Sequence, residues 1–122
     1  MIKNLFVYGT LKTGEVNNHL LRSCEQQGIG VVSNSALLDL SACPGLLLGT
    51  FSKEHWAKGE VYTFENPDVL RSLDTLEQEG KLYKRIITPV AMKDKVVLCW
   101  TYVLLLPIPV KKLIRKGNWR SL

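Results

Sequence analysis

The sequence predicts an α+β protein, a small mixed β-barrel of about six strands with one or two flanking helices. Three observations predict this fold. Short apolar or alternating runs are separated by glycines and turn residues, which is typical of strands. Strong helix-start signals occur in one segment only. Strands and helices do not alternate regularly, which argues against a doubly wound sheet. A length of 122 residues indicates a single domain spanning residues 1–122.

The composition indicates an ordinary globular protein. Hydrophobic residues make up 46% and charged residues 22% of the chain, and the net charge of +5 favours anionic ligands. The N-terminus has no signal-peptide pattern, and the apolar stretch 102–108 is too short to span a bilayer. The spacing of Cys24, Cys43 and Cys99 fits no disulfide or metal site. We therefore expect a cytoplasmic protein with reduced thiols, no bound metal and no membrane partner.

The first half of the chain predicts three strands and one short helix. Apolar runs predict strands at residues 2–8 and 36–40, and alternating polar and apolar residues predict a half-buried strand at 59–64. A short helix is expected at residues 15–24. Pro44-Gly45 predicts a turn.

The clearest helix follows Asn66. Asn66 is a good N-cap residue, Pro67 suits the first helical position, and Asp68 complements the positive end of the helix dipole. Gly80 is the expected stop signal. The predicted apolar stripe consists of Val69, Leu70, Leu73 and Leu76.

After this helix, the sequence predicts a hairpin and a basic tail. Strands are expected at residues 83–90 and 96–105, joined by a turn at residues 93–95. The tail contains no nucleic-acid-binding motif, and we interpret it as a solvated face or tether and expect no nucleic-acid partner. Binding of RNA or DNA that falls steeply with salt would favour the alternative. The tail residues are Lys111, Lys112, Arg115, Lys116, Trp119 and Arg120.

Glu77 occupies an unusual position on the predicted helix. With Val69 at zero and ~100° per residue, Glu77 falls at ~80°, between Leu73 at ~40° and Leu70 at ~100°. A carboxyl inside an apolar stripe is desolvated, which raises its pKa and makes it a better general base near neutral pH. The alternative is that Glu77 lies at a fraying helix end and turns into solvent.

The segment from Tyr8 to Leu11 is a second candidate for function. Gly9 directly follows a predicted strand, and glycine lets a ligand approach the backbone closely. The N–H groups of such a turn can hold a carboxylate or an oxyanion. By itself, the same pattern is equally typical of a plain strand end.

Together and in this order, these segments resemble the γ-glutamyl cyclotransferase-like family, which includes γ-glutamylamine cyclotransferases and the AIG2-like and BtrG-like proteins. The similarity extends along nearly the whole chain. The similar segments are Val7-Tyr8-Gly9-Thr10-Leu11-Lys12, Pro44-Gly45, Gly59-Glu60-Val61-Tyr62, Leu73-Asp74 with Glu77, Tyr83 with Arg85, and Gly117-Asn118-Trp119.

The resemblance implies a small β-barrel and an enzyme that needs no cofactor. The implied reaction cyclises a γ-glutamyl amine, amide or peptide to 5-oxoproline and leaves the identity of the released amine open. Glu77 would be the general acid/base. The implied binding residues for the α-amino-acid end are Tyr8, Gly9, Thr10 and Leu11, and Tyr83 is expected either to line the pocket or to pack in the core. The alternative function is a non-catalytic small-molecule-binding domain of the same fold.

One departure from the family pattern concerns the residue after Glu77. The family usually has glycine there, whereas this chain has Gln78, and a Glu-Gly pair follows as Glu79-Gly80. Glu79 is therefore a rival for the catalytic role. The spacing of Glu77 to Asp74 and Tyr83 matches the family and favours Glu77.

Three further side chains have structural interpretations. We expect Asp74 to be a hydrogen-bonding partner near the helix end and Arg85 to form an ion pair rather than to steer the substrate. Cys43 would act as a nucleophile only beside a base, so a small buried or turn thiol is the preferred interpretation.

Overall fold

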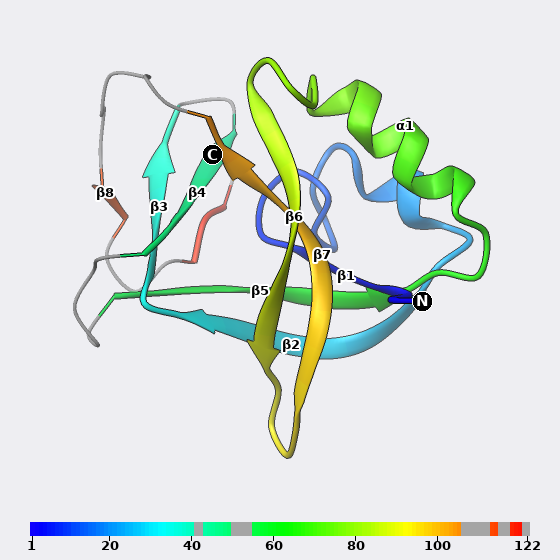
Figure 1. The fold of residues 1–122 in the computed structure, drawn as a ribbon, viewed down its shortest axis with the longest axis horizontal. Helices are drawn as coiled ribbons and strands as arrows, with labels where there is room; N and C mark the ends of the chain where they lie inside the picture. The colour runs from blue at the N-terminus through cyan, green and yellow to red at the C-terminus, as the bar shows by residue number, and fades with distance from the viewer. Residues whose placement is uncertain (41–42, 50–54, 106–112, 115–117, 121–122) are drawn as a thin grey trace.

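The computed structural model describes residues 1–40, 43–49, 55–105, 113–114 and 118–120. Five strands form a closed barrel in the order β1-β5-β2-β6-β7 (Figure 1). Parallel pairing of β1 with β7, at Leu5 and Trp100, closes the barrel, while its other strand pairs are antiparallel. The barrel strands are β1 (Asn4–Val7), β2 (Glu25–Ser33), β5 (Trp56–Thr63), β6 (Tyr83–Ala91) and β7 (Val96–Leu104).

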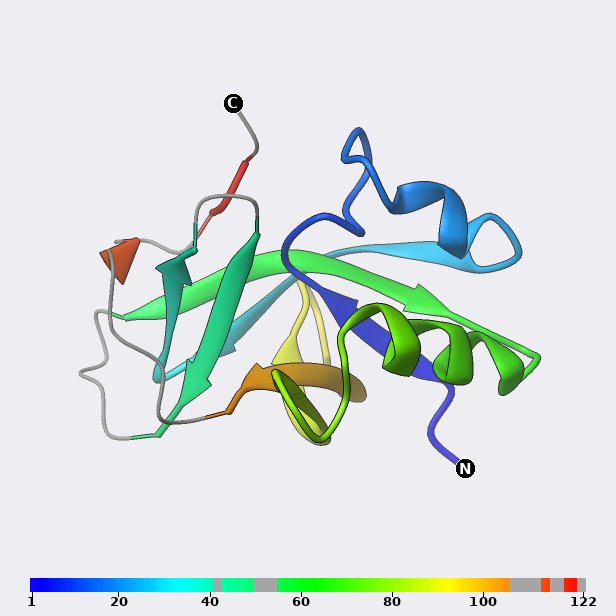
Figure 2. The same cartoon turned by 90° about the horizontal axis from the view of Figure 1, so that it is seen from above.

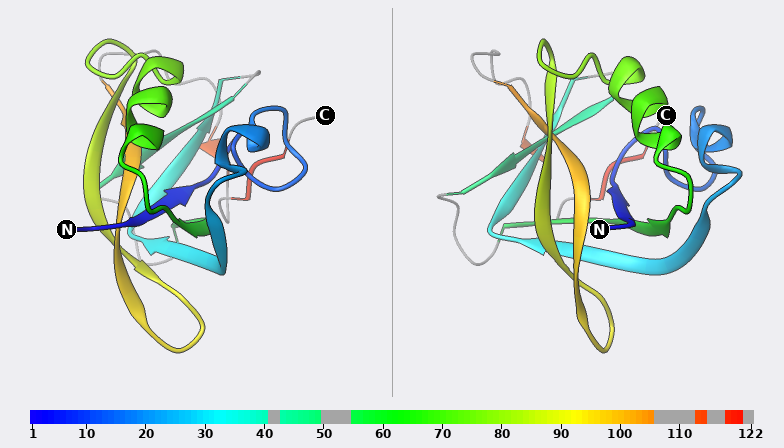
Figure 3. Two further views of the ribbon diagram at one scale, coloured as in Figure 1. Left: turned by 90° about the vertical axis from the view of Figure 1, so that its right-hand side faces the viewer. Right: turned by 45° about the vertical axis from the view of Figure 1, so that its right-hand side comes forward.

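A second sheet and two helical segments flank the barrel. The sheet has the order β4-β3-β8 and lies on the opposite side of the molecule from the helices (Figures 2 and 3). The 3-10 helix η1 packs against α1. These flanking elements are β3 (Ser35–Asp39), β4 (Pro44–Leu48), β8 (Leu113–Ile114), η1 (Asn18–Leu21) and α1 (Asp68–Leu76). The α+β barrel predicted from the sequence is confirmed, with five barrel strands and three outside it among the described residues.

Two buried clusters meet at β1. Phe6 belongs to one cluster with Val61 and Val90, whereas Leu5 and Val7 belong to the other. Because successive residues of a strand face opposite sides, a strand buried on both sides needs apolar residues at every position. The continuous apolar run at the N-terminus is therefore explained by the burial of both faces of β1.

Two predictions for the first half were wrong. The helix expected at residues 15–24 is only the short helix η1. Strand β2, which was not predicted, begins at Glu25 and runs through Gly28 and Gly30. A Cβ atom at position 30 would lie 2.5 Å from Val90 Cγ1, so a glycine is required where β2 crosses the barrel core. Pro44-Gly45 lies in β4 instead of a turn; β4 is an edge strand, where proline is tolerated.

Helix α1 begins at Asp68, one residue after the predicted first position Pro67, and ends earlier than predicted. Asn66 Oδ1 accepts a hydrogen bond from the Asp68 N–H at 3.0 Å. At the other end, Gln78 has a φ of 52°, and the Glu79 N–H donates to the Asp74 carbonyl at 2.9 Å. This is the Schellman ending, in which the left-handed position is usually glycine. The helix therefore ends at Leu76, which is 36% exposed instead of completing the apolar stripe.

The C-terminal segment is only partly described. Pro107, Lys111, Lys112, Arg115, Lys116 and Gly117 lie outside the described residues. Trp119 is 4% exposed and packs in the core, whereas Asn118 and Arg120 beside it are exposed. The Lys12 ammonium donates to the Trp119 carbonyl and to Asn118 Oδ1, which holds this segment against the barrel. Among the described residues, no helix is long and apolar enough to cross a membrane.

Candidate active site

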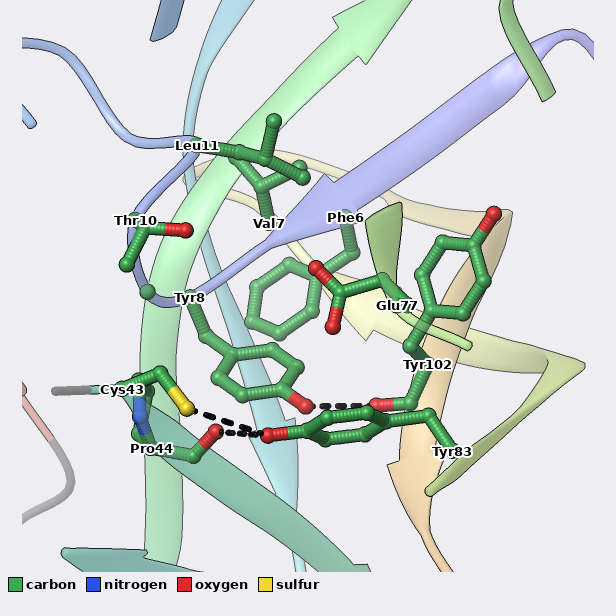
Figure 4. Close-up of a pocket in the computed structure, with 11 residues that line it drawn as sticks. Phe6, Val7, Tyr8, Thr10, Leu11, Cys43, Pro44, Glu77, Tyr83 and Tyr102 are labelled. Carbon is green, nitrogen blue, oxygen red and sulfur yellow. Dashed lines mark hydrogen bonds between the residues drawn. The ribbon is translucent and has the colours of Figure 1, made fainter. Parts of the chain in front are cut away.

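A small pocket lies where the end of β1 meets the end of α1 (Figure 4). All six residues predicted for catalysis or substrate binding line this pocket, although they come from three separate segments. Glu79 does not line it. The lining residues are Phe6, Val7, Tyr8, Gly9, Thr10, Leu11, Cys43, Pro44, Glu77, Tyr83 and Tyr102.

The loop after β1 has a tight approach to β4. A Cβ atom at position 9 would lie 2.6 Å from Pro44 Cδ and 2.7 Å from Pro44 Cγ. Carbon atoms cannot approach so closely, so glycine is needed for the loop to lie against Pro44. The requirement at Gly9 is therefore steric contact with a segment more than thirty residues away.

The polar groups of this loop are used unequally. The carbonyl of Gly9 accepts from the Lys12 N–H at 3.0 Å, that of Thr10 from the Asn17 N–H at 2.9 Å, and that of Leu11 from Asn18 Nδ2 at 2.8 Å. Among the described residues, no protein acceptor is hydrogen-bonded to the N–H groups of Gly9, Thr10 and Leu11. Because the acceptors are satisfied and the donors are not, the loop is suited to bind an anionic or carbonyl oxygen.

Two tyrosines form rigid walls of the pocket. Tyr8 Oη donates to the Tyr102 carbonyl at 2.6 Å, and Tyr83 Oη donates to the Pro44 carbonyl at 2.7 Å. Burial is the main cause that raises the pKa of the Tyr8 phenol and that of the Tyr83 phenol, so both stay neutral. Both predicted roles of Tyr83 hold, because the ring is 2% exposed in the core and also lines the pocket.

Glu77 is the C-cap residue of α1 and its carboxylate points into the pocket, between the rings of Phe6 and Tyr102 (Figure 4). No hydrogen bond or ion pair reaches this carboxylate from the described residues. Burial raises the pKa of Glu77 from 4.5 to about 7. The negative end of the helix dipole acts in the same direction. The interpretation in which Glu77 turns into solvent is therefore wrong.

Glu79 has a different environment. It is exposed, and its Oε2 accepts a hydrogen bond from the Arg85 N–H at 3.3 Å. Gln78, which lies between Glu77 and Glu79, has a left-handed backbone conformation, the conformation that glycine adopts most easily. The family pattern has glycine at this position. The backbone reversal after Glu77 is thus present without the glycine, and it separates Glu77 from Glu79.

Arg85 forms an ion pair, as predicted, and its partner is Asp74, at 2.8 Å. Cys43 is a half-buried free thiol, and its Sγ lies 3.6 Å from Tyr83 Oη. The sequence analysis missed Tyr102, because its place in the pocket depends on the contact of its carbonyl with Tyr8, 94 residues away. In the described part of the chain, no cluster of three or more His, Cys, Asp or Glu side chains could hold a metal ion.

Comparisons with known proteins agree with this fold. The model of the family described as "Gamma-glutamyl cyclotransferase, AIG2-like" matches residues 5–121. The gamma-glutamylcyclotransferase family protein ytfP of Citrobacter rodentium is 33% identical over 117 residues, covering 94% of this chain and 93% of the relative. A crystal structure of an AIG2-like protein from Mus musculus matches with a TM-score of 0.80 and 27% identity, covering 97% of this chain and 88% of that chain. The solution structure of ytfP from Escherichia coli matches with a TM-score of 0.69 and 31% identity, covering 95% of each chain.

Proposed function

The chain belongs to the gamma-glutamyl cyclotransferase, AIG2-like family, and we propose that it cyclises a small γ-glutamyl amine, amide or peptide to 5-oxoproline. Glu77 is the proposed general acid/base. The observation that carries the proposal is the half-buried Glu77 carboxyl, which has no partner among the described residues. It lines the same pocket as Gly9, Thr10 and Leu11, whose N–H groups have no acceptor among those residues either.

The proposed reaction is an intramolecular aminolysis. The α-amino nitrogen of the substrate attacks its own γ-carbonyl carbon, and a new carbon–nitrogen bond closes the five-membered ring. Glu77 accepts the proton that the attacking nitrogen loses. It then donates this proton to the leaving nitrogen as the original amide bond breaks, so that 5-oxoproline and a free amine are released.

A pKa near 7 suits both proton transfers. A carboxyl with an ordinary pKa would be a weak base toward an ammonium group and would seldom be protonated when the leaving nitrogen needs its proton. Burial in a pocket lined by aromatic and aliphatic side chains supplies the shift. One residue can therefore serve as base in the first step and as acid in the second.

The loop supplies the proposed recognition of the γ-glutamyl end. Among the described residues that line the pocket there is no lysine or arginine, so main-chain donors are the groups proposed to bind the negative oxygens of the substrate. The N–H groups of Gly9, Thr10 and Leu11 are available for the α-carboxylate or for the oxyanion of the tetrahedral intermediate. The walls formed by Tyr8 and Tyr83 restrict the substrate to a folded shape in which the amine lies near the carbonyl carbon.

The test is to incubate the purified protein with γ-glutamyl amino acids, γ-glutamyl-ε-lysine and γ-glutamyl polyamines, and to measure 5-oxoproline and the released amine. We expect equimolar products with at least one compound. Glu77→Gln should lower the rate by about 10²- to 10⁴-fold, the usual contribution of a general acid/base.

Glu79→Gln is the matched control, because it changes the neighbouring exposed carboxylate in the same way. It should keep the rate within a few-fold of wild type. Product formation that persists unchanged in Glu77→Gln would refute the catalytic assignment, and loss of activity in Glu79→Gln alone would move the role by two residues. Substrate binding without product from any compound would favour the non-catalytic binding domain.

A further inference from the structure

The last turn of α1 is fastened to the barrel through Asp74. Its Oδ1 accepts hydrogen bonds from Tyr102 Oη at 2.6 Å and from Arg85 Nε at 2.8 Å, and its Oδ2 accepts one from Arg85 Nη2 at 3.2 Å. The Arg85 and Asp74 side chains are 24% and 27% exposed, so the pair is partly shielded from water. Bidentate, charge-assisted bonds of this kind are strong and directional. We call these three residues the Asp74 clamp.

The Asp74 clamp also reaches the opposite wall of the pocket. The main-chain carbonyl of Tyr102 accepts the Tyr8 Oη hydrogen bond at 2.6 Å, while the Tyr102 phenol holds Asp74. Arg85 lies opposite Tyr102 in the β6–β7 register, and its guanidinium carbon lies 4.6 Å from the centroid of the Trp100 ring. Tyr102 therefore connects the wall that contains Tyr8 to the helix that carries Glu77.

Glu77 depends on the backbone of this turn for its position. Its carboxylate has no protein partner among the described residues. Leu73 is the last fully buried residue of α1, and Leu76, one turn further on, is 36% exposed. Asp74 follows Leu73 directly, and its carbonyl also accepts the Glu79 N–H at 2.9 Å. The contacts of Asp74 thus hold both the final turn and the reversal that follows it.

We propose that the Asp74 clamp is a positioning unit that holds the Glu77 carboxyl at a fixed place over the N–H groups of Gly9, Thr10 and Leu11. The proposal rests on the proposed function of Glu77 as general acid/base. Asp74 and Arg85 do not line the pocket, and they act through the backbone of α1 rather than on the substrate. A displacement of about 1 Å at a reacting group can cost about 10²-fold in rate, so small movements of this turn matter.

The ionisable groups around Glu77 come from several elements. The phenols of Tyr8, Tyr83 and Tyr102 and the thiol of Cys43 line the same pocket. Burial is the largest cause raising the pKa of each of the three phenols, so they carry no charge at neutral pH. On the chain segment of Glu77 itself, Asp74 is paired with Arg85, and Glu79 accepts from the Arg85 N–H. Tyr102→Phe removes one donor without changing any charge at neutral pH.

The test compares Tyr102→Phe and Asp74→Asn with wild type in 5-oxoproline formation. Tyr102→Phe keeps the ring and the carbonyl that holds Tyr8, and Asp74→Asn keeps the side-chain shape. We expect kcat to fall about tenfold in each variant while KM stays within about twofold, because positioning of an acid/base affects the chemical step. Arg85→Lys should keep more of the kcat than Arg85→Met. Asp68→Asn, which breaks an exposed ion pair with Arg71 on the same helix, is the matched control and should leave kcat unchanged.

A second test of the clamp does not depend on enzymatic activity. Titration of the Glu77 carboxyl, followed by NMR in the substrate-free protein, should give a pKa near 7 in wild type and a lower pKa in Tyr102→Phe, because a loosened turn lets water reach the carboxyl. Unchanged kcat and unchanged titration, with only a lower unfolding temperature, would overturn the proposal and leave the clamp a structural feature. If wild type forms no 5-oxoproline, the proposed function fails, and the titration alone decides whether the clamp positions Glu77.

Discussion

Two glutamates near the loop after β1 have opposite hydrogen-bonding environments. Glu60 Oε1 accepts hydrogen bonds from the Thr13 N–H at 2.8 Å, from Thr13 Oγ1 at 3.1 Å and from Tyr62 Oη at 3.1 Å. The carboxylate of Glu77 accepts none from the described residues, although both glutamates are half-buried. The number of hydrogen-bond donors, more than burial, therefore separates a structural carboxylate from one that is available for chemistry.

The loop itself shows a similar contrast between its acceptors and its donors. Asn18 Nδ2 donates to the Leu11 carbonyl, and Asn17 Nδ2 donates to Thr10 Oγ1 at 3.0 Å. Within the part of the chain that the structure describes, the N–H groups of Gly9, Thr10 and Leu11 have no acceptor. A polar network thus holds the loop in place and leaves these donors for a ligand.

Among the variants that test this contrast, Gly9→Ala is expected to have the largest effect on activity. The added Cβ would meet Pro44 at 2.6 Å and push the loop away from β4, which displaces its donors. We expect a fall of about 10²-fold in kcat/KM for 5-oxoproline formation, the cost of about 1 Å of misplacement. The double variant Gly9→Ala/Pro44→Ala relieves the clash and should recover part of the activity. Full activity in Gly9→Ala alone would show that the loop does not need this contact.

The two carboxylates should change stability in opposite directions when each is replaced by glutamine. Folded Glu77 keeps its proton up to about pH 7, whereas the unfolded chain releases it near 4.5, so ionisation opposes folding as the pH rises between these values. Glu77→Gln removes this penalty and should raise the free energy of unfolding at pH 8 by at most about 3 kcal/mol, with no gain below pH 4.5.

Glu60→Gln should lower the free energy of unfolding at pH 8 by about 1 kcal/mol, because it weakens charge-assisted hydrogen bonds from Thr13 and Tyr62. Urea unfolding of both variants at pH 4 and pH 8 measures these differences. Destabilisation by Glu77→Gln at pH 8 would contradict the contrast between the two sites.

The smallest effect is expected at Gln78. Glycine at this left-handed position removes the conformational cost of a side chain and should raise the free energy of unfolding by about 1 kcal/mol. Since the backbone reversal already exists, activity should stay close to wild type. Thermal unfolding measures the change in stability, and the 5-oxoproline assay measures the activity. A large gain in activity would mean that the Gln78 side chain restricts the pocket.

Local patterns predicted much of the fold and the site. The helix after Asn66 and the hairpin at residues 93–95 could be predicted because capping residues and alternation act over a few neighbours. The strand β2 could not be predicted, because the glycine at position 30 is required by Val61 and Val90, which lie across the barrel. The role of Tyr102 could not be predicted either, because its carbonyl accepts a hydrogen bond from Tyr8, 94 residues away in the sequence.

The sequence by itself determined the kind of groups present and their local placement: a glycine loop directly after a buried strand, and Glu77 on the apolar side of a helix end. Only the tertiary structure decided what these groups can do. Within the described parts of the chain, the Glu77 carboxylate has no donor, Glu60 Oε1 accepts from three, and the loop carbonyls are paired while the loop N–H groups are not. Desolvation and hydrogen-bond satisfaction depend on atoms contributed by distant segments, so no local pattern encodes them.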